Sequence, residues 1–560
     1  MAVMLLTCWL TPSIRADQTK EPASEAGVVQ ERIKKEADER LKPEHREPTI
    51  EGQPQPVEQP PPAETRFVLK EVILQGNTAL PASAFTPQID PYRNREITVA
   101  ELKGLVSAIE QDYRRRGYLT TIAYLPPQRI EEGRVTIQVL EGRLGKVLVE
   151  GNRYFNATRI LWYWPIQRGE VLRYQPIRAA VLRMNTHPDH QVQLLLRPGE
   201  ATGETDVVLK VTEHFPLHVG SQWDNQGTPS IGRYRYGFSL GYNNLLGLDD
   251  RVIVGTVFGK RFGALYTQYL VPLTPSGTIA TFGFSHSRVA PGRQFKPFGV
   301  NGTSETYSLG LSQPLLDETG LSLDLHTGFD FKESRTMQLS GTVRRERLRV
   351  LRVGPRLQLR DRWGGWSAQF ESSFGIKGLG ATSENNPLAS RPGAPPDFLK
   401  TEFQLTRIQP LPWGTQASAS LDAQVAASKL APAEELYLGG ADSVRGYPEG
   451  DYLADSGLTA RFEYLIPCAI LPSQWRLPGS KNALREQLQL VAFLDRGYGR
   501  LRAITGDERT SRNLMGLGGG VRFRLNDTLS ARLEWGHAVG DRPLTDDSSS
   551  RLHFRIQSTL

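Results

Sequence analysis

From about residue 216 onwards, hydrophobic and polar residues alternate one by one along the chain. One segment shows this clearly, with apolar side chains at Leu458, Ala460, Phe462, Tyr464 and Ile466 and polar ones at Thr459, Arg461 and Glu463. Successive side chains of a strand point to opposite faces, so a period of two predicts strands with one apolar and one polar face. Residues 515–523, 529–535 and 552–557 alternate in the same way. We therefore predict a long succession of β-strands.

The length of this region helps to decide between the two folds that such strands can form. In a soluble sandwich the apolar face meets a core, whereas in an outer-membrane barrel it meets lipid and the polar face lines a wet lumen. Roughly 345 residues are many for one sandwich, but sixteen strands would receive about 22 residues each with their connections. The final residues also alternate, as barrel closure requires. The sequence thus predicts a mainly β protein with a transmembrane antiparallel β-barrel of about 16 strands over residues 215–560.

A short pattern occurs twice before the barrel region. Residues 71–77 (EVILQGN) return as residues 146–152 (KVLVEGN), and each copy has the pattern of a strand that ends in a Gly-Asn turn. A helix is expected after the first copy, with Thr98 and Glu101 at capping-box spacing and an apolar stripe formed by Val99, Leu102, Val106, Ile109 and Tyr113. Strands follow at 119–125 and 134–140, and the second copy has corresponding segments at 177–184, 191–196 and 206–211. We predict two small α+β domains, at 67–142 and 143–214, with the order strand–helix–helix–strand–strand.

The first 66 residues fall into three segments of different composition. Residues 4–10 are a short apolar core that precedes Ala16, so residues 1–16 are expected to be a signal peptide. No basic segment precedes this core, so we expect the signal to be incomplete and the true start codon to lie upstream. Residues 17–45 are charged, and 28–41 within them favour a solvated or pore-lodged helix. Residues 46–66 are rich in proline, which predicts an extended linker.

Charge and composition exclude several classes of protein. No run of about 18 apolar residues occurs, which argues against membrane-spanning helices. The net charge is +7, but the arginines are scattered over strands and loops and no nucleic-acid-binding motif is present. Of the two cysteines, Cys8 lies in the predicted signal peptide, so no disulfide is expected within the mature chain.

Motifs that carry chemistry are equally few. Residues 516–520 (GLGGG) lie within an alternating strand, so they are not a phosphate-binding loop, and their small lumen-facing residues would leave room for a loop folded inside. His187 and His190 share a predicted turn without further ligands and are expected to be surface residues rather than a metal site. No arrangement of nucleophile and base is apparent. We expect no enzymatic activity, no cofactor, no metal, no bound nucleotide and no nucleic acid.

Three segments carry a resemblance to a known family. They are residues 438–447 (LGGADSVRGY), residues 493–495 (FLD) on a following strand, and residues 243–249 (NNLLGLD). In their order, and together with the charged helix, the linker and the two repeats, they resemble the two-partner secretion outer-membrane transporters (TpsB; the ShlB/FhaC/HecB haemolysin secretion/activation family) with POTRA domains. The resemblance covers essentially the whole mature chain. The lumen-loop motif is then Val444, Arg445, Gly446 and Tyr447, and the inner-wall motif is Phe493 and Asp495.

An ion pair between these two motifs follows from the alternation of one strand. Val491, Phe493 and Asp495 share a face, which must be the lumen because a carboxylate facing lipid would be costly. A carboxylate inside a barrel needs a partner, and the planar fork of an arginine fits it. We therefore predict that the Gly-rich loop folds inward, that Arg445 pairs with Asp495, and that Phe493 and Tyr447 pack nearby. Exchange of the two charges should restore part of the activity that each single change removes.

The resemblance also implies a function and a location. It implies an outer-membrane transporter of a Gram-negative bacterium whose POTRA-type domains lie in the periplasm and capture an unfolded exoprotein by edge-strand addition or in apolar grooves. The partner would be a large secreted haemolysin or adhesin with an N-terminal secretion domain, and outer-membrane lipid would surround the barrel. The helix at 28–41 would plug the resting pore. Two alternatives remain open: a factor that assembles other barrels, and a passive porin or receptor.

Overall fold

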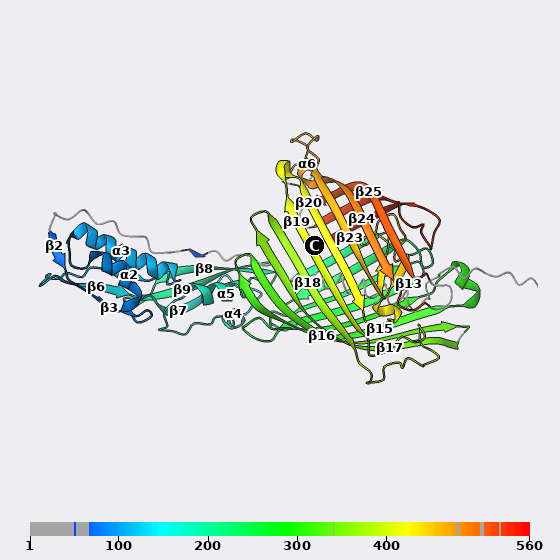
Figure 1. Ribbon diagram of the computed structural model, residues 1–560, viewed down its shortest axis with the longest axis horizontal. Coiled ribbons are helices and arrows are strands. Elements are labelled where there is room, and N and C mark those ends of the chain that lie inside the picture. Colours follow the sequence, from blue (N-terminus) through cyan, green and yellow to red (C-terminus); the bar gives the residue numbers. More distant parts are fainter. Residues whose placement is uncertain are drawn as a thin grey trace, which may run out of the picture.

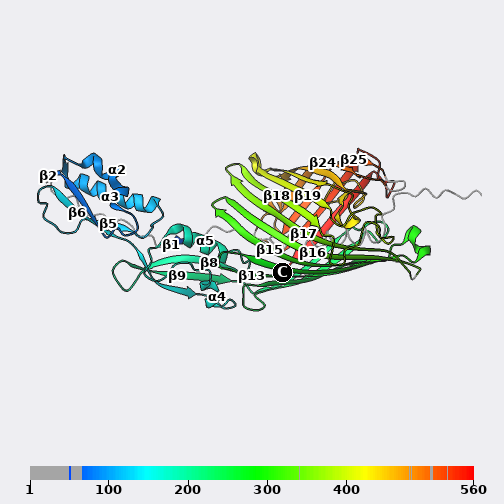
Figure 2. The same cartoon turned by 60° about the horizontal axis from the view of Figure 1, so that its bottom comes forward.

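The computed structural model describes residues 50–51, 66–339, 341–477, 480, 482–504, 509–525 and 528–560. The predicted signal peptide, the charged segment 17–45 and most of the linker lie outside the described residues. The described chain forms two small α+β domains followed by a large barrel, and the domains project from one end of the barrel (Figure 1). Figure 2 separates the two domains and shows the second one next to the barrel.

The barrel is a closed antiparallel sheet of 16 strands. In order they are β10 (Leu217–Asp224), β11 (Arg235–Asn243), β12 (Arg251–Gly259), β13 (Phe262–Pro272), β14 (Ile279–Val289), β15 (Asn301–Glu318), β16 (Leu321–Gln338), β17 (Gly341–Asp361), β18 (Gly364–Gly375), β19 (Leu399–Pro410), β20 (Gln416–Ala426), β23 (Ser456–Pro467), β24 (Leu488–Arg500), β25 (Ser511–Leu525), β26 (Leu529–Ala538) and β27 (Ser550–Thr559). Each strand pairs with the next in this order, and β27 closes the barrel on β10. Closure pairs the backbone amides and carbonyls of the two edge strands, which would find no hydrogen-bond partner in lipid. The predicted barrel is confirmed.

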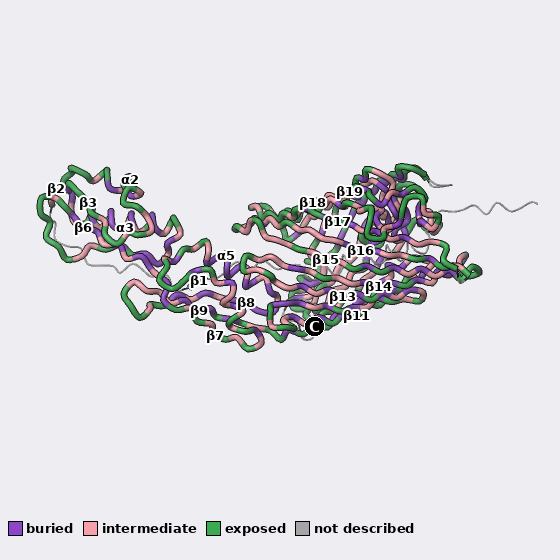
Figure 3. The backbone as a smooth tube through the Cα atoms, turned by 90° about the horizontal axis from the view of Figure 1, so that it is seen from below, coloured by how far each residue is buried: buried purple, intermediate pink, exposed green. Residues whose placement is uncertain are grey.

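The two faces of the barrel wall differ as the alternation predicts. On β24, Val491, Phe493 and Asp495 are buried, whereas Leu490 and Leu494 are 38% and 44% exposed. Similar changes of burial from one residue to the next run along the barrel strands in Figure 3. The apolar face is therefore directed to lipid and the polar face to the lumen.

The connections between strands fall alternately at the two ends of the barrel. The end next to the α+β domains carries mostly short connections such as residues 319–320, and the opposite end carries the long loops 376–398 and 427–455. The described parts of these connections contain three short 3-10 helices, η3 (Arg293–Phe298), η4 (Pro412–Gly414) and η5 (Pro432–Glu434), and the short helix α6 (Leu484–Gln487).

The first α+β domain is organised around one long helix. Helix α3 (Val99–Arg115) packs on a three-stranded sheet of β3 (Glu71–Gln75), β6 (Arg134–Leu140) and β5 (Ile122–Tyr124). The domain also contains β2 (Arg66–Leu69) paired with β4 (Arg95–Thr98), and the short helices η1 (Ala82–Phe85), α2 (Thr86–Ile89) and η2 (Asp90–Tyr92). The predicted strand 119–125 is shorter in the structure, because the Thr121 amide donates to the Tyr118 carbonyl and forms a turn.

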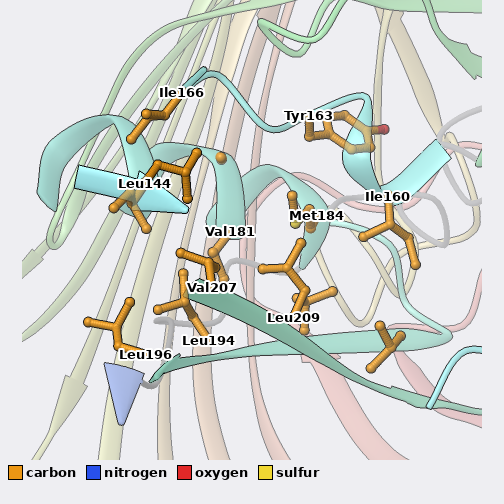
Figure 4. Close-up of a cluster of buried hydrophobic side chains, with 14 of the residues drawn as sticks. Leu144, Ile160, Tyr163, Ile166, Val181, Met184, Leu194, Leu196, Val207 and Leu209 are labelled. Atoms are coloured by element: carbon orange, nitrogen blue, oxygen red, sulfur yellow. The ribbon is translucent and has the colours of Figure 1, made fainter. Parts of the chain in front are cut away.

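The second domain repeats this plan and adds a strand. It consists of β7 (Arg143–Glu150), α4 (Ala157–Leu161), α5 (Tyr174–Met184), β8 (His190–Pro198) and β9 (Glu204–Glu213). Figure 4 shows its apolar core between α5 and the sheet, including Leu144, Val181, Met184, Leu194 and Leu209. The short strand β1 (Ile50–Glu51), from the linker, pairs in parallel with the outer edge of β8. No helix in the described part of the chain is long and apolar enough to cross a membrane.

Polar contacts fix the second domain on the barrel. Asp189 accepts hydrogen bonds from Asn243 at 2.6 Å and lies 2.8 Å from the ring Nε2 atom of His218. His187 and His190, expected at the surface, are instead buried, with ring planes stacked at a centroid distance of 4.8 Å. Burial holds the pKa of each imidazole below its usual value. The surface prediction is wrong because both rings pack on Phe155, at centroid distances of 4.7 Å, while barrel residues bond Asp189 between them, and the local sequence encodes neither contact.

Helix α3 begins with the predicted capping box, which supplies a test of the first domain. The Glu101 amide donates to Thr98 Oγ1 at 3.1 Å, and the Thr98 amide donates to Glu101 Oε2 at 2.8 Å. Thr98→Ala removes the first of these bonds and should lower the unfolding free energy of the domain by about 1 kcal/mol. Urea denaturation of a fragment spanning residues 66–214 measures this change. Thr136→Ala, on a partly exposed strand position, is the control; equal stability of Thr98→Ala and the parent would contradict the assigned cap.

Candidate functional site

The loop of residues 427–455, called the lumen loop below, connects β20 to β23 and folds into the barrel. It contains a small antiparallel pair, β21 (Leu436–Leu438) and β22 (Tyr452–Ala454). Between these strands lies the predicted motif, and Val444, Arg445 and Tyr447 are each at most 1% exposed. A loop of this length is buried without a large apolar core of its own. Its position must therefore be set by contacts with the barrel wall.

The central contact is the predicted one between Arg445 and Asp495. Arg445 Nε and Nη2 donate to the two carboxylate oxygens of Asp495, each at 2.7 Å, and the Arg445 amide donates to Oδ2 at 3.0 Å. Both side chains are almost completely buried, at 2% and 0% exposure. A bidentate pair of this kind fixes both the distance and the orientation of the loop tip.

Two further carboxylates and a second arginine, which the sequence reasoning missed, complete this network. Arg445 Nη1 donates to Glu463 at 2.7 Å and to Glu534 at 3.0 Å. Arg522 bridges the same two carboxylates, donating to Glu463 at 2.7 Å and to Glu534 at 2.8 Å. These residues lie on β23, β25 and β26, so the loop tip contacts several strands at once. Each occupies a lumen position of an alternating strand, which could have marked it as a candidate partner.

Of the remaining motif residues, Phe493 contacts the arginine and Tyr447 lies apart from it. The guanidinium carbon of Arg445 lies 3.5 Å from the ring centroid of Phe493, in cation–π geometry. Tyr447 instead joins Val444 and Leu514 in an apolar cluster, and its hydroxyl accepts the Met515 amide at 3.4 Å. The separation follows from the positive φ of 96° at Gly446, which turns the chain between Arg445 and Tyr447.

Glycines of the barrel wall make the close approach of the loop possible. A Cβ atom on Gly516 would lie 1.9 Å from the Arg445 carbonyl oxygen, and one on Gly536 would lie 2.7 Å from the Gly446 nitrogen. Any larger residue at these positions would displace the loop tip. The expectation that small residues on the lumen face leave room for a loop is confirmed.

A second charge network, not predicted from the sequence, holds the beginning of the lumen loop. The Glu434 carboxylate, at 0% exposure, lies 2.9 Å from the ammonium groups of both Lys332 and Lys400. Arg352 Nη2 donates to the same carboxylate at 3.3 Å. The three cations belong to β16, β19 and β17, a part of the wall that β20 separates from the Arg445 network in strand order. The loop is thus attached to two parts of the wall through opposite charges.

The alternation of polar and apolar residues could indicate the three cations of this second network but not its carboxylate. Lys332, Arg352 and Lys400 occupy lumen positions of regular strands, where buried cations require an anion. Glu434 lies in the 3-10 helix η5, outside any periodic pattern. The end of the loop is held similarly, because Arg391 Nη1 from the loop 376–398 donates to Asp455 at 2.7 Å.

A cavity of about 350 Å³ occupies the lumen between the second domain and these networks. It begins at Tyr163 and Arg183 of the second domain and continues along β12 to β18 as far as Arg352. Apolar residues such as Leu270 and Ile279 line it together with polar ones, which include Asp324, His326, Asp330, Arg356, Gln358, Gln369 and Glu371. The cavity thus connects the second domain to Arg352, whose guanidinium contacts Glu434 at the base of the lumen loop.

The Arg445 network predicts how the loop tip responds to a single change. In Arg445→Ala, Asp495 stays buried without its arginine while Glu463 and Glu534 keep Arg522, which should cost about 3–5 kcal/mol and release the tip. Protease added outside intact cells should then cut within residues 436–455, which are protected in the parent. Arg445→Lys keeps the charge without the fork and should give partial protection.

The same geometry changes the expected result of the charge exchange. In Arg445→Asp with Asp495→Arg, the new carboxylate would face Glu463 and Glu534, so little or no rescue is expected. Full protection of the loop in Arg445→Ala, with the barrel correctly folded, would show that this network does not hold the tip.

The Glu434 network predicts an effect on ion flow. Glu434→Gln removes the loop carboxylate that Lys332, Lys400 and Arg352 share, while Asp330, Glu371 and Glu402 of the wall stay beside Arg352 and Lys400. The base of the loop thus loses its charged attachment to the wall and should loosen. Single-channel conductance in planar bilayers should rise. Glu402→Gln is the matched control, because this carboxylate is more exposed, at 23%, and lies 3.6 Å from Lys400. Equal conductance of Glu434→Gln and Glu402→Gln would contradict the assigned role of Glu434.

Comparison with known proteins places this architecture in a family. Residues 203–523 match the family model "Haemolysin secretion/activation protein ShlB/FhaC/HecB", and residues 67–142 match the ShlB-type POTRA domain. The outer membrane transporter CdiB of Dickeya dadantii (strain 3937) is 27% identical over 470 residues, which are 81% of this chain and 80% of the relative. The heme/hemopexin transporter protein HuxB of Haemophilus influenzae (strain 86-028NP) is 23% identical over 483 residues, covering 82% and 81% of the two chains.

Solved structures agree on the fold. The structure of CdiB from Escherichia coli matches with a TM-score of 0.74 at 21% identity, covering 97% of this chain and 99% of the other. BamA from Haemophilus ducreyi lacking POTRA domains 1–3 matches with a TM-score of 0.54 at 13% identity, covering 88% and 100%. The family match spans more than half of the chain. The chain therefore belongs to the haemolysin secretion/activation protein family ShlB/FhaC/HecB, the outer-membrane transporters of two-partner secretion.

Proposed function

We propose that this transporter binds one large unfolded exoprotein of haemolysin or adhesin type in the periplasm and secretes it through the barrel. The exoprotein would carry an N-terminal secretion domain that engages the POTRA domains, and folding outside the cell would draw the chain through the pore. The observation that carries the proposal is the cavity that runs from Tyr163 and Arg183 of the second POTRA domain along the barrel wall to Arg352, which contacts Glu434 of the lumen loop. An extended polypeptide leaving the domain would enter the lumen directly.

Edge-strand addition is the binding mode that the domains favour. Strand β8 of the second domain already carries the chain's own segment Ile50–Glu51 on its outer edge, in parallel register. This edge therefore has the geometry to pair with an extended peptide through backbone hydrogen bonds, which make little demand on sequence. In the first domain, β3 is an edge strand of the three-stranded sheet in the described part of the chain, and Ile73 on it is 38% exposed.

Barrel assembly is the second candidate, and the likeness to the BamA fold favours it. Such a function would need a seam between the first and last strands that opens toward lipid. Here β10 and β27 pair over five residues from Gly220 to Asp224. Asn225 extends the seam, since its side chain donates to the Leu552 carbonyl at 2.7 Å and accepts the Phe554 amide at 2.9 Å. This pairing is the shortest in the described barrel, but the seam is closed, which supports secretion through the lumen.

Deletion of the first POTRA domain tests the capture step. The two domains have separate apolar cores, so removal of residues 66–142 should leave the second domain and the barrel folded. Secretion of the cognate exoprotein should fall to background, as measured by its amount in the culture medium. Barrel folding is checked by the heat-dependent shift in gel mobility. Normal secretion by the deletion variant would exclude capture by this domain.

A further inference from the structure

The outer face of the barrel carries a group of arginines at the end farthest from the POTRA domains. They lie on β14, β16 and β17 and are Arg288, Arg335, Arg345, Arg347 and Arg349, called the outer arginine patch below. Strands β16 and β17 are among the longest in the barrel, with 18 and 21 residues, and extend to that end (Figure 1). None of these arginines belongs to the networks that hold the lumen loop.

The pairing register arranges this outer face in rows of four residues. The row nearest the middle of the barrel is wholly apolar: Phe282, Leu309, Phe329 and Leu351. The next row toward the far end is Phe284, Tyr307, Phe331 and Arg349. Above it lie His286, Glu305, Glu333 and Arg347, and the last row is Arg288, Thr303, Arg335 and Arg345. The surface therefore changes from apolar through aromatic to strongly cationic within three steps.

Burial confirms that these rows face outward. On β17, Leu351 is 40% exposed, whereas Leu348 and Val350, at the intervening positions, are at most 3% exposed. Since side chains alternate, Arg349, Arg347 and Arg345 continue the face of Leu351 beyond the apolar belt. Arg349 marks the boundary, because its guanidinium carbon lies 4.9 Å from the ring centroid of Phe331.

The patch gathers more positive than negative charge. Glu333 Oε1 accepts from Arg335 Nη2 at 2.7 Å and from Arg345 Nη2 at 2.8 Å, and Arg347 Nε lies 3.6 Å from the same oxygen. One carboxylate oxygen thus serves three guanidinium groups. Glu305, the other carboxylate in these rows, lies 3.2 Å from His286. A single carboxylate balances only one of these three guanidinium charges, and planar guanidinium groups suit the oxygens of a phosphate.

We propose that the outer arginine patch binds the phosphate groups of lipid A, the phosphorylated anchor of lipopolysaccharide in the outer leaflet. The height fits: four residues of a tilted strand place the last row about 10 Å above the aromatic row, where headgroups begin. The orientation fits too, because the arginines continue the lipid-facing side and turn away from the pore. The site would fix the depth and rotation of the barrel in the membrane, and it does not depend on which exoprotein is secreted.

Binding of lipid A to the full-length protein in detergent tests the proposal, with bound lipid counted by native mass spectrometry. The parent should bind lipid A with two phosphates at least about tenfold more tightly than dephosphorylated lipid A. Arg335→Gln with Arg345→Gln should abolish this preference. The matched control is Arg360→Gln at the other end of β17 with Arg362→Gln just after it, which removes the same charge and should keep the preference.

Folding of each variant is verified by heat-dependent gel mobility, so that a lost preference for phosphorylated lipid A is not caused by a misfolded barrel. A parent that binds both lipids equally would overturn the proposal, as would a retained preference in Arg335→Gln with Arg345→Gln. If this variant binds lipid A normally but secretes less exoprotein, the occupant is an acidic polypeptide and the proposal is also wrong.

Discussion

In the hydrocarbon layer a backbone amide or carbonyl that lacks a partner has no water to bind, and this constraint determines the rest of the molecule. It requires the strands to close, and β27 meets β10 with Asn225 extending the seam. Closure creates an outer face that must be apolar and an inner face that remains polar. The buried charges of this protein are acceptable only because they lie on the inner face, near water and near one another.

Within the lumen, buried charges act together with two apolar clusters to decide where the long loop lies. Arg445 is held among Asp495, Glu463 and Glu534, and Glu434 among Lys332, Lys400 and Arg352. Attachments of this kind are directional and strong while every member is present, yet an approaching charged polypeptide or a change in one member weakens them together. Contacts of this kind can hold the loop in place and can still be displaced by a passing chain, which a large apolar core would not allow as readily.

The outer face follows the same logic in reverse. The first arginine of these rows, Arg349, lies beside Phe331 in the aromatic row, and the other arginines lie farther out. The apolar belt within the acyl layer is therefore not interrupted by charge. At the other end of the barrel, Asp189 joins the second POTRA domain to β10 and β11. Polar groups thus make the contacts at both rims of the barrel, and apolar groups face the lipid between the rims.

The sequence by itself determined the features that repeat at short range. A period of two predicted the strands and their lipid and lumen faces, the capping pair of Thr98 and Glu101 predicted the start of α3, and the lumen position of Asp495 predicted that it needs a cation. Tertiary structure decided the contacts between distant segments. Glu434 lies in a 3-10 turn, and the rings of His187 and His190 are buried against Phe155, which lies more than 30 residues earlier in the chain. Periodicity specifies which face a residue occupies, but only closure of the barrel brings a loop, three strands and their charges to one point.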